Sequence, residues 1–194
     1  MSLPFPLQLL TPWLAPDPFP VLADLPVAPR FQELLSSTDS LTRRLERLTG
    51  LSSRVRLADQ SPCSALRDRE EGGRLWSPEY RIPDSGIDLD RKVWLTFGER
   101  DLLFAHSQLA LSGMAPAVRQ AIERGEEPLG SLFLARDAQV NRLHLMLAVC
   151  HAPALAQAAR LPEAHRFIVR RSLFLVAGES CGRILELFLM DLSQ

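Results

Sequence analysis

The 194-residue sequence carries 22 basic and 23 acidic side chains, for a formal net charge of -1 at pH 7. Apolar residues make up 46% and charged residues 23%, which is the usual balance of a globular domain with its own core. No segment concentrates basic residues, so the composition argues against a nucleic-acid surface. The three cysteines, Cys63, Cys150 and Cys181, match no zinc pattern, and their odd number is typical of reduced cytoplasmic thiols. We therefore expect no metal site and no nucleic-acid partner.

Residues 1–29 form an apolar arm that contains many prolines and no Lys or Arg. Signal peptides need a basic start and an unbroken apolar stretch, and the prolines also interrupt any membrane-spanning helix. We expect the arm to lie extended against a single domain of residues 30–194 in a cytoplasmic protein. The sequence does not predict the oligomeric state.

The stretch STDSLTRRLERLTG at 37–50 predicts a helix. Thr38 or Asp39 can cap its start, leucines recur at helical spacing, and Gly50 can end it. A short alternation of arginines with apolar residues at 54–57 then predicts a strand. Residues 59–90 are rich in charge, Pro and Gly, and we expect a long irregular excursion there.

The remaining chain predicts mainly hairpins. Strand-like runs at 92–97 and 102–109 flank the turn GERD, and a helix with Pro116 near its start ends at Gly125. Further on, alternation at 142–147 predicts a strand with Leu143, Leu145 and Leu147 on one face. A short helix within 151–165 and a final hairpin joined by GESCG complete the chain. Strands in hairpins with no βαβ rhythm indicate an α+β fold, an antiparallel sheet of about six strands with helices packed on it.

Glu186 interrupts an apolar run, GRILELFLMDL. In a strand it would share a face with Ile184 and Phe188, so neither face can turn to water without exposing large apolar groups. A buried carboxylate costs several kcal/mol unless it is paired or hydrogen-bonded. Two interpretations remain open: an edge-strand Glu that reaches solvent, or a Glu that lines a cavity.

Five short motifs occur in a fixed order along the chain: SLTR at 40–43, RKV at 91–93 leading to LLFAHS at 102–107, PLG at 128–130 ahead of LF at 132–133, RRS at 170–172, and ELFLM at 186–190. Their order over residues 30–192 resembles the chorismate pyruvate-lyase family, which makes 4-hydroxybenzoate and pyruvate from chorismate. This sequence departs from the family at His106, where the family has Arg, and at Met190, where it has Pro. The loops at 59–90 and 149–165 also look longer than usual.

The resemblance implies a cofactor-free carbon–oxygen lyase whose product, 4-hydroxybenzoate, serves ubiquinone or related aromatic biosynthesis. It implies that Arg91 contacts a ligand carboxylate and that Glu186 hydrogen-bonds the ring hydroxyl, the two residues expected to carry catalysis. A guanidinium can grip a carboxylate with two hydrogen bonds. The residues alone favour a strand-end Arg91 in solvent, because most arginines are exposed.

Four further residues are expected at the ligand by resemblance: Leu41, His106, Leu129 and Gly130. For each a structural interpretation stays open. Leu41 could be a core leucine of its helix, His106 a hydrogen-bonded structural histidine, and the PLG stretch an ordinary turn before a helix.

Two functional alternatives remain. The same fold also serves as the effector-sensing half of some transcription regulators, so a non-catalytic module that binds a small aromatic acid is one alternative. A partner-binding protein that uses its Pro-rich arm is the other, and it would show an exposed apolar patch and no cavity at Glu186.

Overall fold

The computed structural model describes residues 6–22, 25–62, 75–80, 82, 87–112, 114–134, 140–176 and 179–193. The helices are α1 (Pro29–Ser36), α2 (Leu41–Thr49), α4 (Pro116–Arg124), α5 (Leu129–Leu134) and α6 (Pro153–Ala158), with a 3-10 turn, η2, at Pro78–Tyr80. The strands are β1 (Gln8–Leu9), β2 (Ser53–Pro62), β3 (Leu89–Phe97), β4 (Arg100–Leu109), β5 (Val140–His151), β6 (Arg166–Val176) and β7 (Glu179–Phe188). None of the helices in these described ranges is long and apolar enough to cross a membrane.

The strands form one antiparallel sheet in the order β1-β5-β6-β7-β4-β3-β2. The predicted α+β fold is therefore confirmed, with seven strands instead of about six because two residues of the N-terminal arm pair with β5. β7 lies in the middle of the sheet, between β6 and β4. The interpretation of Glu186 as an edge-strand residue is therefore wrong.

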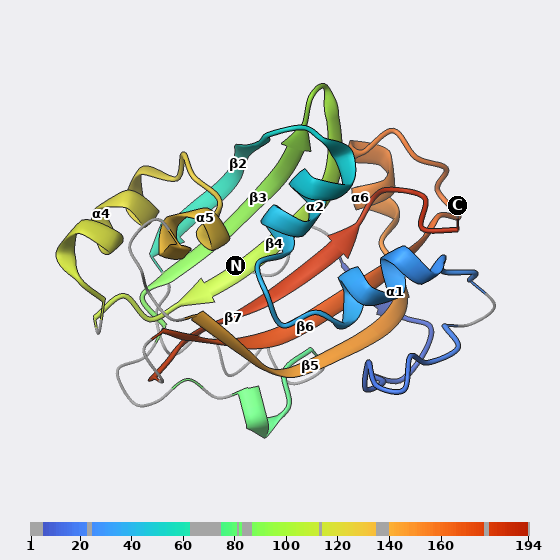
Figure 1. The fold of residues 1–194 in the computed structure, drawn as a ribbon, viewed down its shortest axis with the longest axis horizontal. Coiled ribbons are helices and arrows are strands. Elements are labelled where there is room, and N and C mark those ends of the chain that lie inside the picture. The colour runs from blue at the N-terminus through green and yellow to red at the C-terminus, as the bar shows by residue number, and fades with distance from the viewer. Residues whose placement is uncertain are drawn as a thin grey trace.

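Helices α1 and α2 cross in front of the sheet, and α5 lies in front of its β2–β3 side with α4 beyond it (Figure 1). The predicted helix at the SLTR motif is present, but its cap was assigned to the wrong residues. Ser40, and not Thr38 or Asp39, accepts a hydrogen bond from the Arg43 amide, and Gly50 ends the helix with a positive φ of 68°. A residue in this left-handed region is most easily a glycine.

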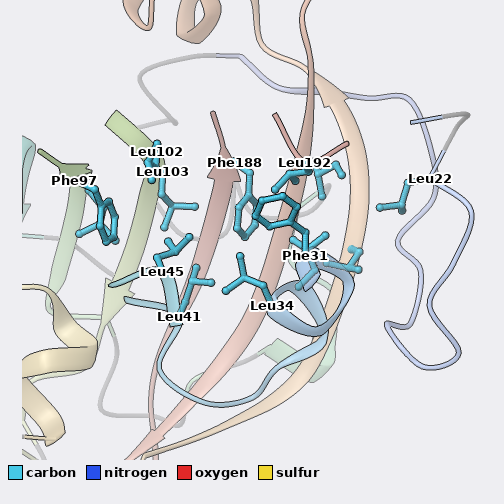
Figure 2. Packing of buried hydrophobic residues seen from close by; sticks show 14 of the residues in the cluster. Leu22, Phe31, Leu34, Leu41, Leu45, Phe97, Leu102, Leu103, Phe188 and Leu192 are labelled. Carbon is cyan, nitrogen blue, oxygen red and sulfur yellow. The ribbon is translucent and has the colours of Figure 1, made fainter. Parts of the chain in front are cut away.

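Apart from register shifts near the strand ends, side chains alternate across β3, β4 and β7, which separates the sheet into two faces. The helix-covered face carries a core of leucines and phenylalanines from α1, α2 and the strands, shown in Figure 2. The opposite face packs aromatic residues of η2, β3, β4 and β6 against α6. We call these the front face and the back face.

β5 departs from the predicted alternation. Its register against β6 shifts between Leu143 and Met146, where His144 has a positive φ of 52°. One extra residue in a strand reverses the faces of the side chains beyond it. Arg142 and Leu147 consequently lie on the same front face, while Leu143 is 45% exposed, so the predicted shared face of Leu143, Leu145 and Leu147 is wrong.

Two loop predictions also change. Residues 59–62, expected within an irregular excursion, continue β2 past a register shift between Leu57 and Asp59. In the final hairpin, β7 already begins at Glu179, so most of the predicted GESCG connection belongs to the strand. Most of the remaining excursion, including Cys63, lies outside the described residues.

Candidate functional site

A small cavity lies on the front face, between the sheet and the starts of α2 and α5. Its volume is about 30 Å³. It is lined by Thr42, Arg91, Val93, Leu95, Ala105, Ser107, Pro128, Leu129, Gly130, Arg142, Phe174, Ile184 and Glu186. The motifs at 91, 128–130 and 186, far apart in the sequence, thus meet in one place.

Glu186 is held by two buried arginines. Arg142 grips both carboxylate oxygens, with Nη1 donating to Oε2 at 3.1 Å and Nη2 to Oε1 at 3.0 Å. Arg170 Nε donates to Oε2 at 2.7 Å. Burial raises the pKa of Glu186, but the charges of Arg142 and Arg170 outweigh it, and the pKa lies below its usual value. Glu186 is therefore an ionised hydrogen-bond acceptor.

Arg91 is 1% exposed and has no carboxylate partner among the described residues. Its Nη2 donates to the carbonyl oxygens of Gly125 at 3.1 Å and Glu127 at 3.0 Å, and its Nε has no partner. Burial lowers the pKa of Arg91 to about 10. A buried guanidinium at a cavity wall, held only by carbonyls and unpaired with an anion, is chemically ready to bind one.

An apolar floor separates Arg91 from Glu186. It consists of Val93, Ala105 and Ile184, which form a small buried cluster on three adjacent strands. The register places Arg91 and Glu186 two strand spacings apart, about 10 Å, and one two-residue step apart along the strands, about 7 Å. A flat molecule with an anion at one end and a polar group at the other matches this spacing.

Leu129 and Gly130 form the cavity wall at the start of α5, as the resemblance implies. A Cβ added to Gly130 would lie 2.6 Å from Ser40 Oγ, so only a glycine allows α5 to approach α2 this closely. The two helix starts therefore close over the cavity.

Leu41 and His106 lie elsewhere. Leu41 belongs to the front-face core beside Leu45 and faces the sheet away from the cavity lining, where its neighbour Thr42 takes the place (Figure 2). His106 points to the back face, where its Nε2 lies 2.7 Å from Asp90 Oδ2. Their positions do not support the expectation that these two side chains meet the ligand. Leu41 packs into the front-face core and His106 faces the back of the sheet.

Arg142, the residue that holds Glu186 most completely, is not among the site residues predicted from the sequence. It occurs in NRLHLML, where simple alternation puts it on the face opposite Leu143, Leu145 and Leu147. The missed signal is charge balance, because a buried Glu requires a buried cation nearby. Only the bulge in β5 shows which cation it is.

A second, larger cavity of about 270 Å³ adjoins the first. The two share Gly130, Arg142 and Phe174, and the outer one adds Thr38, Asp39, Ser40, Arg43 and Arg47. Among the described residues no three His, Cys, Asp or Glu side chains lie close enough together to hold a metal ion. The arrangement defines an α+β domain with a cationic cavity suited to a small organic anion.

Comparisons with known proteins agree with this class. The family model "Chorismate pyruvate-lyase Rv2949c-like" matches residues 35–194, so the chain belongs to this family. No curated protein matches the chain.

Solved structures share the fold at low identity. PhnF from Mycobacterium smegmatis matches with a TM-score of 0.57 and 14% identity over 81% of this chain and 67% of that one. The effector domain of the same protein matches with a TM-score of 0.57 and 13% identity over 78% and 89%. YydK from Bacillus subtilis, described as a possible transcriptional regulator, matches with a TM-score of 0.52 and 12% identity over 76% and 61%. At such identities these matches establish the fold alone.

Proposed function

We propose that this protein is a chorismate pyruvate-lyase, which converts chorismate into 4-hydroxybenzoate and pyruvate without a cofactor. The observation that carries the proposal is the buried Arg91, which contacts no carboxylate in the described part of the chain and lines the same cavity as the ionised Glu186 across an apolar floor. Arg91 would bind the ring carboxylate and Glu186 would accept a hydrogen bond from the ring hydroxyl. The ring would lie on Val93, Ala105 and Ile184.

Charge balance supports a substrate with two carboxylates. Three guanidiniums are buried at or beside the cavity: those of Arg142 and Arg170 hold the carboxylate of Glu186, and that of Arg91 lies across the apolar floor. Chorismate carries one carboxylate on the ring and one on the enolpyruvyl ether, so it would offset the excess positive charge. Buried cations stabilise a bound anion more strongly than exposed ones because water competes less for them.

The reaction needs no further reagent. The ether carbon–oxygen bond and the neighbouring ring carbon–hydrogen bond both break, the ring becomes aromatic, and the released enolate takes up a proton to give pyruvate. The protein would supply a fixed geometry for the ether and stabilise the negative charge that moves onto the leaving enolate. Arg91 and Arg142 are the positively charged groups of the cavity lining that could do so.

The cavity must enlarge to admit a ring. Its volume of about 30 Å³ is roughly one water's share of liquid volume. The starts of α2 and α5 close over it from the side of the outer cavity. Substrate binding would therefore separate these two helix starts.

The test is a turnover assay. Purified protein is mixed with chorismate, pyruvate is followed by a coupled assay, and 4-hydroxybenzoate is quantified by chromatography. We expect equal amounts of the two products, with turnover lost in Arg91→Met and Glu186→Gln and retained in Arg54→Gln, which removes an exposed arginine of β2. Folded wild-type protein that forms no product would overturn the lyase proposal.

The second candidate is a non-catalytic module that binds a small aromatic acid at the same cavity. It is favoured by the shared fold of the PhnF effector domain. This candidate predicts that 4-hydroxybenzoate binds and that chorismate persists unchanged. The same assay, combined with a binding titration, separates the two functions.

A further inference from the structure

We propose that Arg142 is a positioning residue that holds Glu186 as an ionised hydrogen-bond acceptor facing the cavity, and thereby selects ligands that carry a hydroxyl opposite their carboxylate. The inference rests on the proposed aromatic-acid site but does not require turnover. It assigns different tasks to the two arginines that contact Glu186.

Arg170 ties Glu186 to the fold. It is completely buried, and its Nη1 donates to the carbonyl oxygens of Leu34 at 3.3 Å and Ser37 at 3.1 Å, at the end of α1. It does not line the cavity. Its guanidinium satisfies the unpaired carbonyls of a helix end as well as the carboxylate, so its removal would disturb the packing of α1.

Arg142 instead lies on the ligand side. It lines both the inner and the outer cavity, and its guanidinium lies 5.8 Å from the ring centre of Phe174, which also lines both. Its two Nη atoms donate to the two carboxylate oxygens of Glu186, and Nη1 also donates to Ser172 Oγ at 3.0 Å. Arg142 therefore fixes the plane of the carboxylate at the wall between the cavities.

The fixed carboxylate determines which ligand fits. An ionised carboxylate has no proton to donate, so it favours a hydroxyl and disfavours a second anion. The charged groups facing Glu186 are Arg142 from β5 and Arg170 from β6, with Arg91 of β3 in the same cavity and Arg44 of α2 acting on Arg170. The charges of Arg142 and Arg170 both lower the pKa of Glu186, so removal of Arg142 should raise it.

The first test measures ligand selection. The affinities of 4-hydroxybenzoate and benzoate are measured by calorimetry for the wild type, Arg142→Met, Arg142→Lys and Arg171→Met. Arg171 neighbours Arg170 on β6, but it packs on the back face against Trp13 and Tyr80. It is therefore a matched buried arginine away from the cavity.

We expect the wild type to prefer 4-hydroxybenzoate by roughly 10- to 100-fold, as for a hydrogen bond to a charged group. The preference should fall below about threefold in Arg142→Met, recover in part in Arg142→Lys, and stay unchanged in Arg171→Met. An unchanged preference in Arg142→Met overturns the proposal. So does a wild type that binds neither compound, or that binds both equally.

The second test uses carbon-13 NMR of the glutamate side-chain carboxyls, with the Glu186 signal assigned by Glu186→Gln. The signal should titrate at higher pH in Arg142→Met than in the wild type, and Arg171→Met should match the wild type. If Arg142→Met does not fold, Ser172→Ala, which removes the other contact of Arg142 Nη1, should shift the titration in the same direction. An unmoved titration overturns the role of Arg142, whereas absent turnover with a shifted titration overturns only the lyase.

Discussion

The same three strands, β3, β4 and β7, carry buried charges on both faces of the sheet, and the two sets are balanced differently. On the back face, Asp90 lies 3.0 Å from Lys92 Nζ, 2.7 Å from His106 Nε2 and 3.2 Å from Gln108 Nε2, so the buried anion has a cation beside it. On the front face, Arg91 lies next in sequence to Asp90 and Lys92 and yet meets no carboxylate among the described residues. Buried charges that have a counter-ion within the fold need no ligand, whereas a buried charge without one beside a cavity indicates a ligand site.

The largest expected effect is on the front face, at Glu186. Glu186→Gln removes the only carboxylate that Arg142 and Arg170 contact in the described part of the chain. Two buried guanidiniums without a counter-ion should lower the free energy of unfolding by about 3–5 kcal/mol, measured by urea denaturation.

The matched control for Glu186→Gln is Asp39→Asn. It breaks an exposed ion pair with Arg44, in which the aspartate is 68% exposed, and should change stability little. An equal loss of unfolding free energy in the two variants would mean that the buried charges on the front face matter no more to stability than an exposed ion pair.

The next effect is acid sensitivity of the back face, at Asp90. Burial raises the pKa of Asp90, but His106 and Lys92 outweigh it and bring the pKa to about 2 from 3.8. Because the pKa is lower in the folded state, the stabilisation is present above about pH 4 and is lost as the pH falls towards 2. The difference corresponds to about 2–3 kcal/mol.

The measurement is urea denaturation of the wild type and Asp90→Asn over this acid range. The wild type should be more stable by about 2–3 kcal/mol at about pH 5, and its advantage should shrink as the pH falls. An advantage that does not depend on pH would mean that Asp90 stabilises the fold through shape and not through its charge.

The regular strands, and some of the residues that line the cavity, were predictable from the sequence. Period-two alternation placed Ile184, Glu186 and Phe188 on one face of β7, as the structure has them. The cost of burying an idle carboxylate singled out Glu186, and the order of short motifs brought Arg91 and Gly130 to the same cavity. These predictions depend on local patterns and on simple free-energy costs.

The predictions that failed are those that depend on the register between strands. One extra residue in β4, Leu102, shifts its pairing with β3, and one extra residue in β5 shifts its pairing with β6 between Leu143 and Met146. No local pattern marks either shift. The first shift helps to set which residue lies opposite His106, namely Lys92 on the back face. The second turns Arg142 towards Glu186. Tertiary packing, and not local sequence, fixes both.

A smaller effect tests how the back face excludes water around its aromatic residues. Tyr80 is the only tyrosine of the chain, and its hydroxyl donates to the carbonyl of His144 in the bulge of β5. Burial raises the pKa of Tyr80 to about 12, although nearby Arg171 opposes the shift. The near-ultraviolet absorbance of the phenolate should therefore appear near pH 12 in the folded protein and near pH 10 in denaturant.

Because its folded pKa is raised, Tyr80 contributes stability below about pH 10 that is lost as the pH rises towards 12. Tyr80→Phe removes the hydrogen bond to the bulge and should cost about 1 kcal/mol at neutral pH. A phenol that titrates near pH 10 in the folded protein would show that water reaches the back face. The charged side chains of the back face would then need no partners within the fold.

The smallest expected effect is that of a substitution at His106, which tests whether the back-face cluster contributes to ligand binding. His106→Gln removes a side chain that the family resemblance places at the ligand, whereas the structure places it against Asp90 on the back face. The variant should weaken the fold by about 1 kcal/mol, since Asp90 keeps Lys92 and Gln108 as partners. The affinity for 4-hydroxybenzoate should stay within about twofold of the wild type, whereas Arg91→Met should lose at least about tenfold. If His106→Gln lost as much affinity as Arg91→Met, charges on the two faces would act as one site through the shared strands. The presence or absence of a counter-ion within one face would then not distinguish a structural cluster from a ligand site.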